Sequence, residues 1–445
     1  MRGIAATALN PVANAIIQLG TVPVLLHAWG TAKYGDWLML SAVPSYLTLT
    51  NMGFGDASGS DMTLRASSGD KNGVIETFQS SLALLFGVSS IVLLAVISLV
   101  WLFPWQRSMH LASLSDRNAA QVVLSLAIYI VLAQQSGVIE SGFRCNGHFA
   151  IGTSCSTLLR LGETVVASIV GVYTGNLLIT AVTYLVFRCF ATVAYALLLH
   201  RMTPWLPIGL SKASLERIKE LAKPALGFMA MPLGYAISLQ GFTLLIGSIL
   251  GPIAVTAFST LRTMTRVNFQ LMTVIAWAIW PELSSAFGAG NLALARRLHR
   301  RAYQCGLALS IGSALSLWAA GPWIYRIWIH RAVTLNINCF HVLLAVTLLN
   351  SLWFTSSVVP MSTNSHHRLA AGFVTASSVS LALASVLVPR FGITGAACAL
   401  LLVDAWMMWT VLRTSLRQLH DEFRPFVNAL FQLPTSLTAK PVGQA

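Results

Sequence analysis

The stretch QSSLALLFGVSSIVLLAVISLVWLF, residues 79–103, decides the fold class, because it contains no charged side chain from one end to the other. A helix of about 20 apolar residues crosses the hydrocarbon core of a bilayer. Strands of a membrane β-barrel are instead segments of about ten residues with alternating polarity. Because lipid offers no hydrogen bonds, the backbone must satisfy its own polar groups. The stretch therefore predicts a transmembrane helix.

The rest of the chain repeats this pattern on both sides of that stretch. Of 445 residues, 56% are hydrophobic and only 9% are charged, whereas an ordinary soluble domain carries about 25% charged residues. The composition excludes a soluble enzyme with one anchor, a disordered chain and a disulfide scaffold. The apolar runs predict twelve spans, near residues 8–28, 36–56, 79–103, 120–143, 149–172, 177–199, 225–249, 252–281, 302–325, 338–361, 369–388 and 392–412.

The longest basic connection, residues 200–223, divides these spans into two groups of six. Its segment SKASLERIKELAKP predicts a short amphipathic helix that Ser214 caps and Pro224 ends. We expect this helix to lie flat at the cytoplasmic interface. The predicted fold class is an all-α polytopic membrane protein with two six-helix lobes around a central cavity. The expected parts are an N-terminal lobe (1–202), a cytoplasmic amphipathic linker (203–223), a C-terminal lobe (224–413) and a cytoplasmic tail (414–445).

The two halves also resemble each other at a nearly constant offset, which indicates a duplication. Six spans per copy is an even number, so both copies would insert with the same orientation, related by an axis along the membrane normal. Two such bundles that enclose a cavity are typical of transporters. The matching positions are Gly30 with Gly251, Gly69 with Gly290, and Thr174-Gly175 with Thr394-Gly395.

Orientation follows from the distribution of Lys and Arg between the spans. With the N-terminus in the cytoplasm, eighteen of the 28 basic residues fall on the cytoplasmic side and six on the opposite side, and four lie within spans. Cytoplasmic loops carry the excess of Lys and Arg, so both termini are predicted to be cytoplasmic. The net charge of +14 is then a topology signal, and no nucleic-acid partner is expected.

The eighth predicted span carries polar and cationic side chains at every third or fourth position, which places them on one face of a helix. An arginine at the centre of a membrane costs about 2.5–3.5 kcal/mol on insertion scales, so it faces either water or a partner. Two interpretations stay open: the stripe lines a transport cavity, or its arginines pair with carboxylates elsewhere. The candidate substrate-binding residues of this span are Ser259, Arg262, Thr263, Arg266 and Gln270.

Other polar residues within spans form a second group of candidates. Arg160 and Glu163 are three residues apart and can neutralise each other along the fifth span, which makes a packing role as plausible as a substrate or coupling role. Asn14 and Gln18 continue a stripe that begins at Asn10, and hydrogen bonds between helices explain it equally well. Arg188 has the same two interpretations. The candidates are Arg160, Asn14 and Gln18 for substrate binding, and Glu140, Glu163 and Asp404 for coupling.

Summed over the spans, four arginines face three carboxylates, so a cavity built from these residues carries a positive bias and favours an anionic ligand. The sequence lacks a GxxxxGK[ST] loop for nucleotide phosphates and a spaced set of metal ligands. We therefore expect a protein that is not an enzyme, with no cofactor and no metal site.

Three stretches are similar to sequences of a known family. GTAKYGDWLMLSAVPSYLTLTNMGFGDA (30–57), LGPIAVTAFSTLRTMTRV (250–267) followed by WPELSSAFGAGN (280–291), and VPRFGITGAACALLLVD (388–404) resemble polysaccharide or O-antigen flippases. These belong to the multidrug/oligosaccharidyl-lipid/polysaccharide exporter superfamily. The similarity extends over about residues 10–413.

The resemblance implies two lobes that alternate between inward-facing and outward-facing states in the bacterial inner membrane. The implied cargo is an anionic lipid-linked oligosaccharide, a polyprenyl pyrophosphate, for surface polysaccharide and lipopolysaccharide biosynthesis, with Arg262 and Arg266 on the pyrophosphate. Implied partners are the lipid bilayer and a polysaccharide polymerase or glycosyltransferases. The alternative is a cation-coupled multidrug or small-molecule exporter of the same superfamily. It would need carboxylates in its lobes, which are few here.

Overall fold

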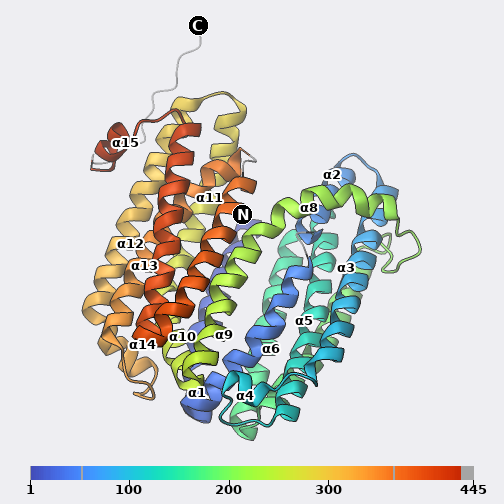
Figure 1. Cartoon of the computed structure of the whole chain (residues 1–445). Helices are drawn as coiled ribbons and strands as arrows, with labels where there is room; N and C mark the ends of the chain where they lie inside the picture. Colours follow the sequence, from blue (N-terminus) through green and yellow to red (C-terminus); the bar gives the residue numbers. More distant parts are fainter. Residues whose placement is uncertain (1, 52–53, 364–365, 432–445) are drawn as a thin grey trace.

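The computed structural model describes residues 2–51, 54–363 and 366–431, and this part of the chain is helical without a strand. Figure 1 shows two bundles of long helices. They meet at a narrow end, where α1 and α10 lie against each other, and diverge toward a wide end that carries α2, α8 and α15. Within the described residues, nine helical stretches are long and apolar enough to cross a membrane.

The N-terminal bundle consists of five long helices and three shorter ones. Its elements are α1 (Arg2–Ser45), the 3₁₀ helix η1 (Tyr46–Asn51), α2 (Phe54–Ser67), α3 (Lys71–Val100), α4 (Trp105–Met109), α5 (Asp116–Cys145), α6 (Phe149–Thr174) and α7 (Leu177–Met202). The C-terminal bundle contains α8 (Leu215–Ala236), the π-helix η2 (Ile237–Gly241), α9 (Phe242–Leu250), α10 (Pro252–Thr265), α11 (Val267–Gly288), α12 (Leu292–Trp328), α13 (Ile337–Ser362), α14 (His366–Gln418) and α15 (Phe423–Leu430).

Two of the long helices each contain two spans. Gly30 interrupts α1 with φ 75° and ψ 171°, and Gly392 interrupts α14 with φ 58° and ψ −144°. Only glycine adopts such backbone angles without strain, so the chain turns back into the membrane at these points. The eighth span is α10 and α11 together. The described residues thus contain the twelve predicted spans in two lobes of six, and the predicted fold class is confirmed.

The predicted internal repeat is visible in the backbone. Gly30 and Gly251, 221 positions apart, share nearly the same conformation, since Gly251 has φ 82° and ψ 179°. The third pair of the predicted alignment does not share a backbone conformation. Gly175 has a positive φ of 58°, whereas Gly395 does not have a positive φ. Gly395 lies inside the helix instead, close to the carbonyl of Leu387.

The second repeat pair also has matching caps. Gly69 and Gly290 both have positive φ, 81° and 67°. The next residue of each half caps a long helix: Asp70 accepts from the Gly73 amide at 2.9 Å, and Asn291 accepts from the Leu294 amide at 3.0 Å. The hydrogen bond from Gly73 and the Arg65 guanidinium hold the pKa of Asp70 below its usual range. The same turn chemistry therefore starts α3 and α12.

The connection between the lobes differs from its prediction in one respect. Ser214 caps α8 as expected and accepts from the Arg217 amide at 3.4 Å. The helix does not end at Pro224, however, but continues to Ala236 and becomes the seventh span. A proline removes one helix hydrogen bond, and within a span the surrounding apolar environment still favours helix. The segment before α8 is fixed to α3, since the Lys212 amide donates to Gln79 at 2.6 Å.

The orientation of the chain is open to a direct test. We expect the wide end to be cytoplasmic, because the 200–223 connection lies there with α8. All six cysteines are free and can be replaced by serine. In that background, Ala213→Cys should resist an impermeant maleimide in intact cells. Ala332→Cys, in the loop between α12 and α13, should react. Both positions are exposed, so labelling of Ala213→Cys alone would invert the orientation.

Candidate functional site

A cavity of about 480 Å³ lies between the lobes. Its N-terminal wall is α1, and its C-terminal wall is built from η2, α9, α10 and α11. Six of the eight predicted substrate-binding residues line it, from both lobes: Gln18, Ser259, Arg262, Thr263, Arg266 and Gln270. The polar residues spaced three or four apart on the eighth span therefore share one face, which lines the cavity. Their role in substrate binding stays a prediction.

The backbone of the eighth span breaks at Arg266. Its φ of −82° and ψ of −1° separate α10 from α11. The amide of Arg266 donates to the Arg262 carbonyl at 3.1 Å, and the amide of Phe269 donates to the Arg266 carbonyl at 2.9 Å, which tightens the chain at this point. The sequence predicted one continuous helix here. Irregular backbone at membrane depth is tolerated where it lines a cavity, and Arg266 does so.

A second irregularity faces this break. The seventh span contains the π-helical turn η2, and its Leu239 carbonyl accepts a hydrogen bond from Nη1 of Arg262 at 3.2 Å. Nη2 of Arg262 donates to the Thr243 hydroxyl, also at 3.2 Å. The guanidinium lies 5.3 Å from the centre of the Phe258 ring. Single π-helical turns within helices often occur at functional sites, and here one fixes the position of Arg262.

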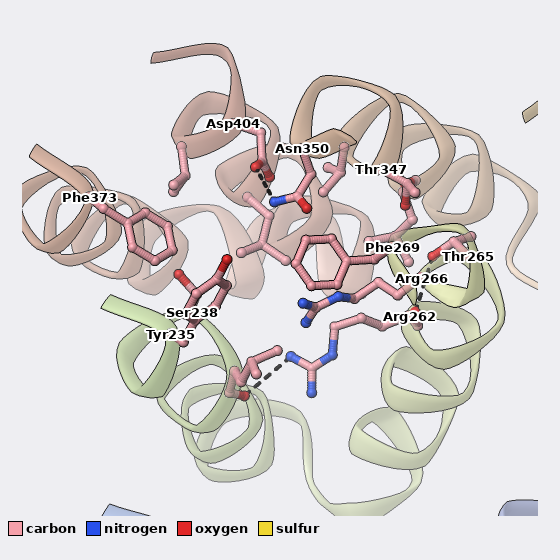
Figure 2. Close-up of a pocket in the computed structure, with 15 residues that line it drawn as sticks. Tyr235, Ser238, Arg262, Thr265, Arg266, Phe269, Thr347, Asn350, Phe373 and Asp404 are labelled. Carbon is pink, nitrogen blue, oxygen red and sulfur yellow. Dashed lines mark hydrogen bonds between the residues drawn. The ribbon is translucent and has the colours of Figure 1, made fainter. Parts of the chain in front are cut away.

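The guanidinium of Arg266 is less restrained. It lies 5.4 Å from the centre of the Phe269 ring and is half-buried. Among the described residues it forms no salt bridge, and no side-chain hydrogen bond to it is found. Figure 2 shows the guanidinium groups of Arg262 and Arg266 side by side, both directed toward the middle of the pocket. The two cations therefore reach the same space from one helix.

A smaller cavity of about 50 Å³ adjoins the first within the C-terminal lobe, and both arginines line it too. On its far side lies Asp404, only 5% exposed. Asp404 accepts from the Asn350 amide at 2.8 Å (Figure 2) and from the Trp353 indole at 2.7 Å. Neither arginine forms an ion pair with a carboxylate of the described residues. The direct pairing that the sequence left open is therefore not found.

The carboxylate of Glu163, in the N-terminal lobe, has a different partner from the one predicted. It forms a buried ion pair with Arg188 of α7, rather than with Arg160 on its own helix. The Tyr129 hydroxyl donates to the same carboxylate oxygen at 2.8 Å, and the other oxygen is buried without a partner in the described structure. The three-residue spacing on α6 permits an ion pair between Arg160 and Glu163. However, α7 packs directly against α6, and its Arg188 pairs with Glu163 instead.

The remaining candidates lie in the N-terminal lobe, outside the lining of the inter-lobe cavity. Arg160 donates to Asn10 at 2.9 Å, and Glu140 accepts from Thr153 at 2.8 Å. Asn14 is half-buried on α1. The hydrogen bond between Asn10 and Arg160 joins α1 to α6. It agrees with the interpretation that the polar stripe of the first span forms hydrogen bonds between helices. Gln18 of the same stripe faces the cavity instead.

Several lining residues were not predicted. All are uncharged, and the search for intramembrane charges passed over them. A weaker signal was present, because two serines are four residues apart on the second span and therefore share a helical face. The additional polar lining residues are Tyr34, Ser41, Ser45, Gln240, Thr243 and Thr260.

Comparison with known proteins gives a consistent picture, although no family model matches the chain. The probable multidrug resistance protein NorM of Pseudomonas syringae pv. tomato is 24% identical over 341 residues, which covers 71% of this chain and 69% of NorM. An inward-facing multidrug resistance MATE family transporter of the MOP superfamily has a TM-score of 0.77 at 14% identity. The match covers 93% of this chain and 98% of that transporter's chain. This chain has the fold of the MATE transporters. An outward-facing MATE structure has a TM-score of 0.67 at 14% identity, covering 97% and 96% of the two chains.

A further structural neighbour is a MOP superfamily transporter from Pyrococcus furiosus. Its TM-score is 0.66 at 12% identity, and the match covers 97% of this chain and 96% of the other. Reverse polarity of its binding pocket suggests a different function for that protein.

The comparisons overturn the prediction of a lipid-linked oligosaccharide flippase for polysaccharide or lipopolysaccharide biosynthesis. NorM and the MATE structures are named as multidrug transporters. They match the alternative prediction, an exporter of drugs or other small molecules. The physical reason lies in the motifs on which the prediction depended. Gly30, Gly251 and Gly392 adopt positive φ at turns of the backbone, so these motifs specify the shared fold and not the cargo.

Proposed function

We propose that this protein is a MATE-type membrane transporter that exports small molecules by alternating access of its two lobes. The observation that carries the proposal is the polar cavity between the lobes of a fold shared with multidrug transporters. Its volume of about 480 Å³ lies within the roughly 300–1,000 Å³ of small-molecule sites. The bacterial inner membrane, with both termini in the cytoplasm, is the location that fits this role.

The conformation supports an inward-facing state. The lobes diverge at the wide end (Figure 1), and the TM-score is higher with the inward-facing neighbour than with the outward-facing one. At the narrow end the Thr256 hydroxyl donates to the Thr31 carbonyl at 2.7 Å. The Trp328 indole donates to the Leu19 carbonyl, also at 2.7 Å. Each of these contacts joins the two lobes, and export requires that they break.

Asp404 is the coupling residue that the geometry favours among the three candidates. It is a buried carboxylate without a cationic partner in contact, next to the arginines of the cavity. Glu163 is already paired with Arg188, and Glu140 is only half-buried. A buried carboxylate without a counter-charge gains most from binding a proton or a sodium ion.

Transport can be tested in a bacterial strain that lacks its own efflux pumps. Cells that express the protein should accumulate less of at least one compound from a panel of anionic, neutral and cationic drugs, compared with cells carrying an empty vector. Gln18→Trp should restore accumulation, because the indole fills part of the cavity. Val193→Trp is the matched control, since Val193 is 59% exposed on α7 and lies outside the cavity lining. Accumulation equal to the vector for the whole panel would contradict the proposed function.

A further inference from the structure

The charge of the inter-lobe cavity has one sign. Its described lining contains two guanidinium groups, those of Arg262 and Arg266, and no carboxylate. The adjoining small cavity adds one carboxylate, Asp404, which hydrogen-bonds to Asn350 and Trp353 and not to either arginine. The lining of the two cavities together therefore remains net positive. Such a surplus of positive charge attracts an anion.

The hydrogen-bond donors of the arginines are largely unused. A guanidinium carries five N–H groups in a planar arrangement that matches a carboxylate or a sulfonate. Arg262 uses two of its groups, on the Leu239 carbonyl and the Thr243 hydroxyl. For Arg266 no donor is engaged with a described side chain. Its pair of terminal donors is therefore free to bind two oxygens of one ligand.

The rest of the lining suits the apolar body of such a ligand. Val22 and Leu38 of α1 and Phe269 of α11 contribute apolar surface. Gln18 and Gln270 add amide groups, which can orient polar substituents. The cavity thus combines one cationic region with apolar side chains from both lobes, set among polar ones.

On the basis of the proposed function, we propose that the substrates are amphiphilic organic anions. A carboxylate or sulfonate binds to Arg266 beside Arg262, and an aromatic or aliphatic body packs against Val22, Leu38 and Phe269. A cationic compound of the same shape would face two guanidinium groups without a counter-charge. The cavity therefore selects its substrates first by their charge and only then by their shape.

Two fluorescent probes with the same body and opposite charge test this inference. Dansylglycine carries a carboxylate, and dansylethylenediamine carries an ammonium group. We expect the purified full-length protein in detergent to bind dansylglycine at least about 10-fold more tightly than the amine. Arg266→Ala should weaken dansylglycine binding by about 10- to 100-fold, because hydrogen bonds between charged groups are lost. Arg266→Lys should recover only part of it, because an ammonium lacks the planar pair of donors.

Arg413→Ala is the matched control, since Arg413 is exposed on α14 and lies outside both cavities. It removes the same charge and should leave both affinities unchanged. A monodisperse elution profile for each variant shows that it is folded. Equal or tighter binding of the amine, or unchanged dansylglycine binding by folded Arg266→Ala, would refute the inference.

The cellular assay separates this inference from the proposed function. If the cells export neither class of compound, the transporter role itself fails. If they export cationic drugs but not dansylglycine, and Arg266→Ala does not alter that export, the transporter role stands and the anion site is refuted. Export of dansylglycine that Arg266→Ala abolishes, while Arg413→Ala retains it, supports both.

Discussion

Arg188→Ala is expected to lower the free energy of unfolding by about 3–5 kcal/mol, the usual cost of removing one partner from a buried ion pair. Glu163 is 1% exposed and Arg188 is 7% exposed, so the remaining carboxylate would be left in the N-terminal lobe without a counter-charge. The Tyr129 hydroxyl, which donates to the same oxygen at 2.8 Å, cannot neutralise it. The measurement is unfolding of the purified protein in mixed micelles, followed by intrinsic fluorescence.

A double-mutant cycle identifies the pair as the cause. Glu163→Gln alone leaves the guanidinium without a counter-charge and should also destabilise the lobe, whereas Glu163→Gln combined with Arg188→Ala should recover most of the loss. Arg160→Ala is the control on the same helix as Glu163, because its hydrogen bond goes to Asn10. Strictly additive losses in the double variant would show that the two side chains do not act on each other.

Gly35→Ala is expected to reduce export by an order of magnitude or more, because it prevents the lobes from meeting at the narrow end. A Cβ atom at Gly35 would lie 2.1 Å from the carbonyl oxygen of Pro252. The obstructing atom is backbone at the start of α10, so no side-chain rotation can relieve the clash. The change should therefore force the two lobes apart at this end.

The matched control for this prediction is Gly20→Ala on the same helix, where nothing lies within 4 Å of the added Cβ. Export of a compound identified in the efflux strain and the thermal melting temperature are measured for both variants. Loss of export and a lower melting temperature should occur for Gly35→Ala alone. Equal export by the two variants would mean that close contact between Gly35 and Pro252 is not needed in the transport cycle.

The sequence was sufficient where local chemistry decides the structure. A span is determined by the hydropathy of its own residues, so the twelve spans could be predicted. Positive φ at Gly30 and Gly251 reflects a local property of glycine, so the first match of the repeat could be recognised. The match of Gly175 with Gly395 does not hold in the backbone, because a glycine at a turn and a glycine inside a helix look alike in the sequence.

Features that depend on contacts between helices could not be predicted. The π-helical turn at Leu239 contacts the eighth span one helical turn before the break at Arg266, because Arg262 hydrogen-bonds to the carbonyl that the turn presents. Nothing in either segment alone indicates the other. The polar stripe did predict which face of the eighth span meets the cavity. The partner of Glu163 was mistaken, because Arg188 lies 25 residues away in sequence.

The arginines without a carboxylate in contact also bear on the energy source of transport. A membrane potential of 100 mV, negative inside, does work of about 2.3 kcal/mol on each elementary charge that crosses the membrane. A monovalent anion leaving the cell moves with this field, whereas a cation leaves against it. If Arg262 and Arg266 select anionic cargo, the voltage across the membrane itself drives export, and collapse of the voltage would slow it even where proton and sodium gradients are absent.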